Sequence, residues 1–437
     1  MSVAPARGQG ATPYFPADSW YRPVFRRLVL LDSNSVADAA RAWPVTHGAT
    51  TSYINGRAGF DSRNNTLRAG TMQPLGTGYS YPGPRTQPDH QTALLLVRAG
   101  SSLGPHFAAG VEAALNQAGG SLRAAYGSAR WRAVEAWAGR RHLGFSTGPA
   151  SGIVLNERTP FTGVGLILPD GVAVPVVQRI YLDLAVARLR RSGTVEHPYF
   201  HASRITLAPH ADLAIGLNRA VIFGGDDHIA ITPARIALML LGFPDVRGKD
   251  SDFENQVASI DVLWRVRRGA TPVVVYAEYG ADDSGFAFAR VPAVLAGVEV
   301  LRLPSLPDWG VGLEAVHFAR RCCTYPPWYR HGALADGWTD RGRLLGHPLG
   351  GDGSEAALTG SYTHNLRVSS RVFVRRRGID NLFSPDRQGW SSGAAFSLGL
   401  PVKSVTVELH GEAEFGANWS AGTARLTIGR VWPATLH

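Results

Sequence analysis

Residues 405–416 (VTVELHGEAEFG) alternate between apolar and polar side chains almost without a break. Every second residue from Val405 to Phe415 is apolar except Gly411, and the residues between them are Thr, Glu or His. Side chains of a β-strand point alternately to its two faces, so the pattern predicts a two-faced strand. In a soluble sandwich the apolar face would form the core. In a membrane barrel it would meet lipid, and the charged face would line the interior.

The same alternation recurs along the chain, between clusters of Gly, Pro, Asp and Asn that predict turns. Many strands are therefore expected, and closing them into a barrel removes the edges that an open sheet would have to protect. The polar faces carry Gly, Ala, Ser and Arg rather than the Lys/Glu mixture of a solvated surface. The prediction is an all-β fold, a large antiparallel transmembrane β-barrel of about 16–18 strands. Representative strands are 204–208, 212–218, 259–267, 272–280, 371–376, 394–400 and 424–432.

Aromatic residues stand near the ends of several of these strands. In a membrane barrel they could form girdles at the two lipid–water interfaces, whereas ordinary core packing is the alternative for each of them. The residues concerned are Trp131, Trp137, Trp264, Tyr279 and Trp432.

The N-terminal part differs from the rest. Residues 18–31 and 35–43 show short helical patterns, the second with Ser35 as a possible cap and Pro44 as its end. We therefore expect a flexible N-terminus over 1–17, a short helical periplasmic or plug element over 18–60, and the barrel over 61–437.

Extended loops are expected within the barrel at 224–255 and 322–355. The first of these loops should contain one short helix. Thr232 would be its cap, Pro233 its first residue and Gly242 its end.

The chain is basic, with a formal net charge of +10, and the charge is carried almost wholly by arginine because Lys249 and Lys403 are the only lysines. Composition bias explains this as well as function does. Functionally, guanidinium groups suit carboxylates and phosphates, which favours an acidic glycan or lipopolysaccharide as a partner. The arginines are scattered and no nucleic-acid-binding module is present, so nucleic acid is not expected as a partner.

Cys322 and Cys323 are adjacent, which allows two unpaired thiols or a strained vicinal disulfide. No run of eighteen apolar residues predicts a transmembrane helix, and no hydrophobic segment near the N-terminus predicts a signal peptide. The chain would then be either cytoplasmic or a mature form.

Motifs that could carry catalysis are weak. The string GFSTG at 144–148 resembles a nucleophile elbow but is followed by Pro149 rather than by a helix-forming sequence. His197 and His201 lack the glutamate of a zinc motif, and the acidic pairs stand among turn residues. We therefore expect no catalytic centre, no metal and no cofactor.

Residues 322–353 form a long loop that is dense in Trp, Tyr, Arg, His and Asp. Aromatic faces and guanidinium groups are suited to holding sugar rings and acidic sugars, although a loop that plugs the pore is an equal alternative. The candidate polysaccharide-binding residues are Trp328, Tyr329, Arg330, Trp338, Arg341 and Arg343.

An ordered set of segments resembles the outer-membrane capsule-assembly proteins of the Wzi family. The similarity covers residues 20–430 and is clearest over 197–355. It implies a monomeric outer-membrane barrel of about eighteen strands with a small N-terminal helical element. It also implies a lectin-like role in retaining capsular polysaccharide, without a catalytic centre. The segments are 197–227, 255–266, 272–283, 310–318 and 329–353.

Two other functions compete with a polysaccharide-binding barrel. A porin-like channel for sugars or anions would fit an arginine-rich interior, and its conductance in planar bilayers would separate it from a plugged lectin. A soluble, β-rich carbohydrate-active enzyme is the third possibility, and solubility without detergent would support it.

If the chain is a membrane barrel, it should be extracted by detergent and should migrate differently on SDS gels before and after heating. The reason is that a closed barrel resists SDS until it is heated. A chain that stays monodisperse in buffer without detergent would contradict the barrel.

Overall fold

The computed structural model describes residues 51–65, 91–103, 106–116, 119–145, 152–156, 160–168, 171–192, 195–210, 212–226, 228, 231–240, 254–268, 271–282, 292–300, 302–320, 328–329, 337–340, 343–363, 366–378, 387–402 and 405–433. The expected flexible segment 1–17 and the expected helices at 18–31 and 35–43 lie outside these residues, as do Cys322 and Cys323.

The described residues are almost entirely β-strands. The long strands are Thr51–Asn65 (β1), Gln91–Leu103 (β2), Phe107–Asn116 (β3), Gly119–Trp131 (β4), Val134–His142 (β5), Pro160–Ile167 (β6), Arg179–Arg188 (β8), Tyr199–His210 (β11), Leu213–Phe223 (β12), Glu254–Arg268 (β13), Thr271–Asp282 (β14), Ala293–Val300 (β15), Trp309–Phe318 (β16), Gly353–Thr363 (β19), Arg367–Arg377 (β20), Gly389–Val402 (β21), Val405–Gly416 (β22) and Ser420–Pro433 (β23). The two-residue strands are Val172–Ala173 (β7), Arg191–Ser192 (β9), Val195–Glu196 (β10), Thr339–Asp340 (β17) and Arg343–Leu344 (β18).

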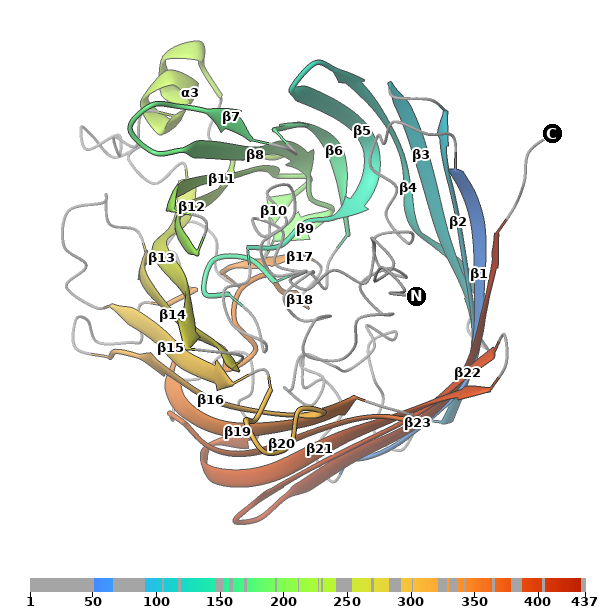
Figure 1. Ribbon diagram of the computed structural model, residues 1–437. Coiled ribbons are helices and arrows are strands. Elements are labelled where there is room, and N and C mark those ends of the chain that lie inside the picture. Colours follow the sequence, from blue (N-terminus) through green and yellow to red (C-terminus); the bar gives the residue numbers. More distant parts are fainter. Residues whose placement is uncertain are drawn as a thin grey trace.

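The long strands close into one ring (Figure 1). Nineteen strands share the sheet, and because β7 pairs only with β8, the remaining eighteen form the barrel wall. Each strand is antiparallel to its neighbours, and β1 closes the ring by pairing with both β2 and β23. This confirms the predicted antiparallel barrel and its strand number.

The barrel begins earlier than the sequence predicted. Strand β1 starts at Thr51, so residues 51–60 belong to the wall and not to the helical element expected over 18–60. The reason lies in closure, because β1 supplies the hydrogen-bonding partner for the outer edges of both β2 and β23.

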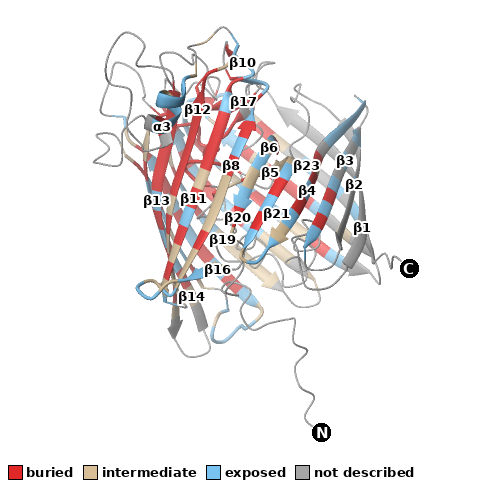
Figure 2. Ribbon diagram, turned by 90° about the horizontal axis from the view of Figure 1, so that it is seen from above, coloured by how far each residue is buried: buried red, intermediate tan, exposed pale blue. Residues whose placement is uncertain are grey.

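The burial of the side chains shows which face of residues 405–416 points to the outside of the barrel. His410, Glu412 and Glu414 of β22 are buried, whereas Leu409 and Phe415 are exposed on the outside. Strands β13 and β14 show the same order, with Asp261 and Glu278 inside and Val262 and Val275 outside. The buried and exposed residues alternate along the wall in Figure 2. The apolar face is therefore the outer surface, as in a membrane barrel.

Exposed aromatic residues lie near both rims of the outer surface. Phe107, Trp131, Trp264 and Trp309 lie near one rim, and Tyr199, Tyr279, Trp390 and Phe415 lie near the other. Such belts mark the two lipid–water interfaces of membrane barrels. Trp131, Trp264 and Tyr279 therefore occupy girdle positions. Trp137 takes the alternative of core packing because it faces the interior, and the side chain of Trp432 lies outside the described part.

The two ends of the barrel differ. At the short-turn end, pairs of strands are joined by as little as Arg132 and Ala133, and β1 begins and β23 ends there. At the opposite, long-loop end lie the connections 224–253 and 319–352.

The connection 224–253 contains the helix Pro233–Leu240 (α3), and the Arg235 backbone N–H donates to Thr232 Oγ1 at 3.3 Å, which confirms the predicted cap. Gly242 lies outside the described residues. No helix in the described part is long and apolar enough to cross a membrane.

Replacing Val262, in the middle of β13 and 37% exposed on the outer wall, by Arg should cost about 2–4 kcal/mol in a lipid bilayer, because a cation would meet hydrocarbon. The matched control is Leu306→Arg. Leu306 is also apolar and is 52% exposed, but it lies in the turn between β15 and β16 at the short-turn end. There the cost should stay within about 0.5 kcal/mol. Reversible unfolding from vesicles by denaturant measures both values, and equal costs would show that the outer wall does not face lipid.

Candidate functional site

Segments from three connections fold inward at the long-loop end and pack against the inner face of strands β5 to β16. They are 143–145 with 152–156, from the connection between β5 and β6; 189–192 with 195–198, between β8 and β11; and 328–329 with 337–340 and 343–352, between β16 and β19. The short strands β9, β10, β17 and β18 belong to these segments and lie inside the ring in Figure 1. We call the three inward segments together the plug.

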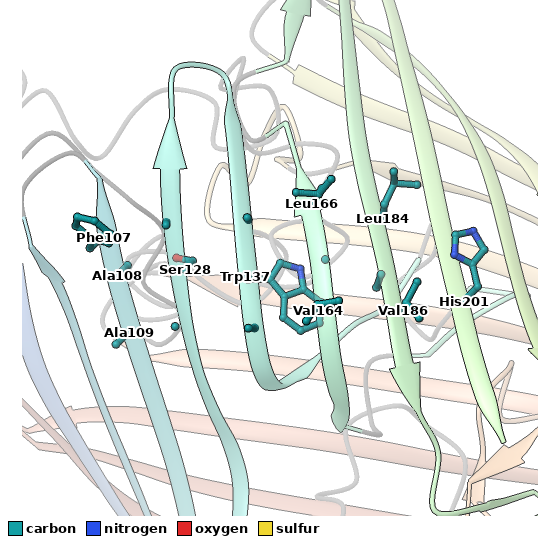
Figure 3. Close-up of a pocket in the computed structure, with 16 residues that line it drawn as sticks. Phe107, Ala108, Ala109, Ser128, Trp137, Val164, Leu166, Leu184, Val186 and His201 are labelled. Carbon is teal, nitrogen blue, oxygen red and sulfur yellow. The ribbon is translucent and has the colours of Figure 1, made fainter. Parts of the chain in front are cut away.

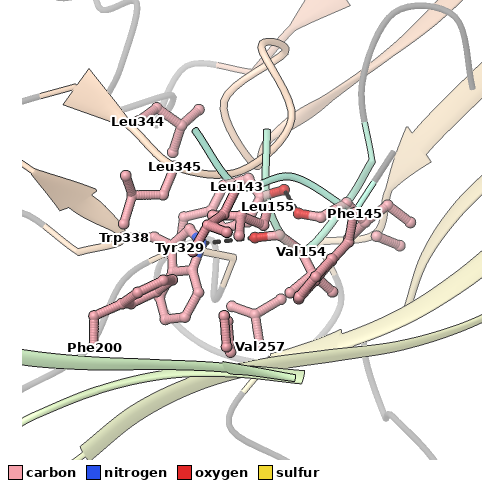
Figure 4. Close-up of a cluster of buried hydrophobic side chains, with 14 of the residues drawn as sticks. Leu143, Phe145, Val154, Leu155, Phe200, Val257, Tyr329, Trp338, Leu344 and Leu345 are labelled. Atoms are coloured by element: carbon pink, nitrogen blue, oxygen red, sulfur yellow. Dashed lines mark hydrogen bonds between the residues drawn. The ribbon is translucent and has the colours of Figure 1, made fainter. Parts of the chain in front are cut away.

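The plug has a hydrophobic core of its own, which is continuous with inward-facing wall residues. Trp328 is 1% exposed, and Tyr329 and Trp338 are fully buried. Figure 4 shows Trp338 and Tyr329 beside Leu345, Leu155 and Phe200. Phe318 on β16 contacts both Trp328 and Tyr329, with ring centroids 5.2 and 5.5 Å apart. The plug is therefore packed like the interior of a soluble domain.

Hydrogen bonds join two plug segments that are far apart in the sequence. The Asn156 backbone N–H donates to the Leu345 carbonyl at 2.6 Å. Its side-chain Nδ2 donates to the carbonyls of Leu344 and Gly346 at 2.8 and 2.6 Å. The Trp338 indole donates to the Val154 carbonyl at 2.9 Å. Asn156 is buried, so it satisfies backbone groups that would otherwise lose their hydrogen bonds inside the barrel.

The Tyr329 hydroxyl also links 152–156 to the segment that contains His347. It donates to the Ile153 carbonyl and accepts from the His347 backbone N–H at 2.9 Å. Burial raises the pKa of Tyr329 well above its usual value, which keeps the phenol protonated and able to donate. Gly346 and Gly351 lie against Tyr329, and Gly351 also against the Trp328 backbone, so a side chain at either glycine would collide with these atoms. The glycine-rich run 346–353 is thus needed for packing.

The third segment, 189–192 with 195–198, is bonded to the same core. The backbone N–H groups of Arg190 and Arg191 donate to Asp340 Oδ1 at 2.9 and 3.4 Å. Ser192 Oγ donates to the Gly337 carbonyl at 2.9 Å. A carboxylate that accepts two backbone donors fixes the position of a loop that would otherwise be free to move.

A polar network on the wall anchors the plug. Glu278 accepts from the Ile153 backbone N–H at 3.1–3.2 Å and from Ser259 Oγ at 2.7 Å. Arg204 donates to both oxygens of Asp261, at 2.7 and 3.0 Å. Asn218 connects the two halves, because its Nδ2 donates to Ser259 at 3.0 Å and to Asp261 at 2.6 Å. All of these side chains are buried, and their mutual bonds offset the cost of removing them from water.

The structure changes the role of three candidate residues. Trp328, Tyr329 and Trp338 were expected to hold sugar, with the tryptophans stacking on the rings. All three are buried in the plug core, so their faces are covered by protein. The burial of these three side chains agrees with the alternative in which residues 322–353 form a plug. Arg330 and Arg341 lie outside the described residues, and Arg343 lies in β18 with its side chain outside the description.

Exposed charged side chains lie at the long-loop end beside the plug. Arg188 Nη2 lies 3.2 Å from Asp226 Oδ1, and His197 Nδ1 lies 2.7 Å from Asp226 Oδ2. Arg191 lies 3.4 Å from Glu196. The hydrogen bond with His197 and the nearby Arg188 hold the pKa of Asp226 below its usual value, so this carboxylate is ionised at neutral pH. We call this exposed group, together with Arg190, the charged rim.

A second interior network lines the wall from β16 to β22. Arg375 pairs with Glu355 at 2.6 Å and with Glu414 at 3.1 Å. Arg371 pairs with Glu355 and, at 3.4 Å, with Glu314. These groups are buried, so losing one partner would leave an uncompensated charge inside the barrel.

One cavity of about 890 Å³ lies along strands β3 to β11, and it is a poor candidate for sugar (Figure 3). Its lining is almost wholly apolar, and Ser128 and His201 are its main polar side chains. A sugar needs several convergent hydrogen-bonding groups. Within the described residues, no group of three or more His, Cys, Asp or Glu is placed to hold a metal ion.

Comparison with known families decides the affiliation of the chain. Residues 87–400 match the family described as "Capsule assembly protein Wzi". The chain belongs to the Wzi family. No sequence among curated proteins matches it.

Solved structures agree with the fold. This Wzi-family chain is similar to Wzi of Escherichia coli, described as an outer-membrane, carbohydrate-binding β-barrel involved in group 1 capsule assembly. The TM-score is 0.67 at 17% identity, over 92% of this chain and 88% of that one. Pseudomonas aeruginosa OpdO is also similar, with a TM-score of 0.54 at 14% identity over 88% and 98% of the two chains. OpdH of the same organism gives 0.55 at 9% identity over 90% and 100%. The Wzi-family chain thus has the fold of an outer-membrane β-barrel.

Replacing Asn156 by Ala should loosen the plug, because the carbonyls of Leu344 and Gly346 would lose their donor at a cost of about 1–3 kcal/mol. Hydrogen–deuterium exchange should rise in 152–156 and 343–350 and stay unchanged in the barrel strands. Asn418→Ala is the matched control, since Asn418 is exposed in the turn between β22 and β23 at the same end. Unchanged exchange in both plug segments would show that Asn156 does not hold them together.

Proposed function

We propose that this protein binds and retains an acidic surface polysaccharide at the long-loop end of an outer-membrane barrel, without catalysing a reaction. The observation that carries the proposal is the packed plug, which offers a folded protein surface to polymers at that end of the barrel. Membership of a capsule-assembly family supports it. In outer-membrane barrels short turns face the periplasm and long loops the exterior, so the long-loop end would face the capsule.

The basic groups at this end supply the chemistry. Arg190 and Arg191 are exposed on the charged rim, and Arg330, Arg341 and Arg343 belong to the connection that forms the plug. A single exposed ion pair contributes less than about 1 kcal/mol, so retention would depend on several pairs acting along a repeating polymer. Added salt should weaken such binding. Lipopolysaccharide and outer-membrane lipid would surround the wall, and the barrel would act as a monomer.

A channel is the second candidate, because the fold is also similar to those of OpdO and OpdH, which are porin-like barrels. The plug core argues against it, since buried Trp, Tyr and Leu side chains take up interior space beside β5 to β16 at the long-loop end. The purified protein should therefore conduct little in planar bilayers, and conductance comparable to that of an open porin would support the channel instead.

The double substitution Arg341→Ala with Arg343→Ala should reduce polysaccharide retention on cells and leave heat-modifiable gel migration unchanged. The matched control is Arg130→Ala with Arg302→Ala, which removes two arginines at the short-turn end. Retention equal to that of the parent in both double variants would place the binding surface elsewhere. A loss in the control alone would reverse the proposed orientation.

A further inference from the structure

Two arginines and a tryptophan meet at the long-loop end, away from the plug. Arg377 is the last residue of β20, Arg387 precedes β21, and Trp419 lies in the turn between β22 and β23. The guanidinium carbons of Arg377 and Arg387 lie 5.9 and 5.6 Å from the centroid of the Trp419 ring. One aromatic ring therefore attracts two cations, while the two cations repel each other.

The two arginines differ in their partners. Arg377 Nη1 donates to Glu414 Oε1 at 2.7 Å, and its Nη2 lies 3.4 Å from Oε2. Arg387 is only 2% exposed, and within the described residues it makes no ion pair. Its Nε and Nη1 have no hydrogen-bond partner there, and neither does Arg377 Nε. Three donor nitrogens beside one ring are thus buried without an acceptor in the described part of the chain.

Glu414 cannot supply the missing acceptor. It already accepts from Arg375, from Arg377 and, at 2.7 Å, from Ser391 Oγ. Burial, and then repulsion from Arg377, lower the pKa of Arg387 to about 10, so it is still a cation at neutral pH. A buried, unpaired cation is costly unless it serves to bind an anion.

We propose that Arg387 and Arg377, held by the face of Trp419, form a seat for one carboxylate group of an acidic sugar. The planar guanidinium fork of Arg387 matches the two oxygens of a carboxylate, and Arg377 Nε adds a third donor. The source of the carboxylate rests on the proposed function, which brings an acidic polymer to this end of the barrel. A phosphate group, as carried by lipopolysaccharide, is the competing occupant.

Glucuronate is the probe for the full-length protein in detergent, with glucose as the neutral control and inorganic phosphate as the competing anion. Calorimetric titration should show that glucuronate binds, that glucose does not, and that phosphate binds more weakly than glucuronate. Arg387→Gln should weaken glucuronate binding about tenfold or more, because a hydrogen bond to a charged group is lost. Arg387→Lys keeps the charge but loses the fork, so its loss should be smaller.

Arg376→Gln is the matched control, because Arg376 is the neighbouring arginine of β20 and is exposed on the outer face. It should bind glucuronate like the parent. Glucuronate should also raise the unfolding temperature of the parent and of Arg376→Gln, but not that of Arg387→Gln. Equal affinity in the parent and Arg387→Gln, or tighter binding of phosphate than of glucuronate, would overturn the assignment.

Polysaccharide retention, measured on cells in parallel, separates this inference from the proposed function. If the parent protein retains polysaccharide but does not bind glucuronate, the carboxylate site is contradicted and the proposed function is not. If the parent binds glucuronate through Arg387 but retains no polysaccharide, the proposed function is contradicted and the carboxylate site is not.

Discussion

The structure depends on the pairing of β1 with β23, which turns a long antiparallel sheet into a ring. Inside a bilayer no water can satisfy backbone N–H and C=O groups, so every strand edge must be paired with protein. Closure then gives each residue of the wall only two positions, facing lipid or facing the interior. Apolar side chains such as Val262 and Leu409 face outward, and groups such as Asp261 and Glu414 face inward.

Because the polar side chains face inward, the barrel interior must offset the free-energy cost of burying charged groups. The interior contains buried arginines and carboxylates, and most of the described ones are tied into shared networks. Arg204 with Asp261 is one case, and Arg375 with Glu355 and Glu414 is another. Such pairs add little net stability compared with apolar packing, but each partner becomes indispensable once the other is buried. Arg387 departs from this rule, which is why it invites a functional explanation.

The strand faces could be predicted from the sequence because a period of two survives wherever one face meets lipid and the other meets polar groups. The prediction failed where that contrast was absent. Trp137 faces inward, while Ala136 and Ala138 face outward, so the alternation did not distinguish the two sides. The aromatic residues of the plug were interpreted as exposed sugar-binding groups. Tyr329 bonds Ile153 across 176 positions and Trp338 bonds Val154 across 184, and no local pattern encodes such contacts.

That separation along the chain has a kinetic consequence. Contacts between residues distant in sequence form slowly, because a large loop must close before they can contribute. The segment 152–156 leaves the wall after β5, whereas its partner at 344–346 follows β16, so the two can meet only when most of the strands have assembled. The plug is therefore a late-forming element, and partly assembled barrels would still lack its contacts at the long-loop end.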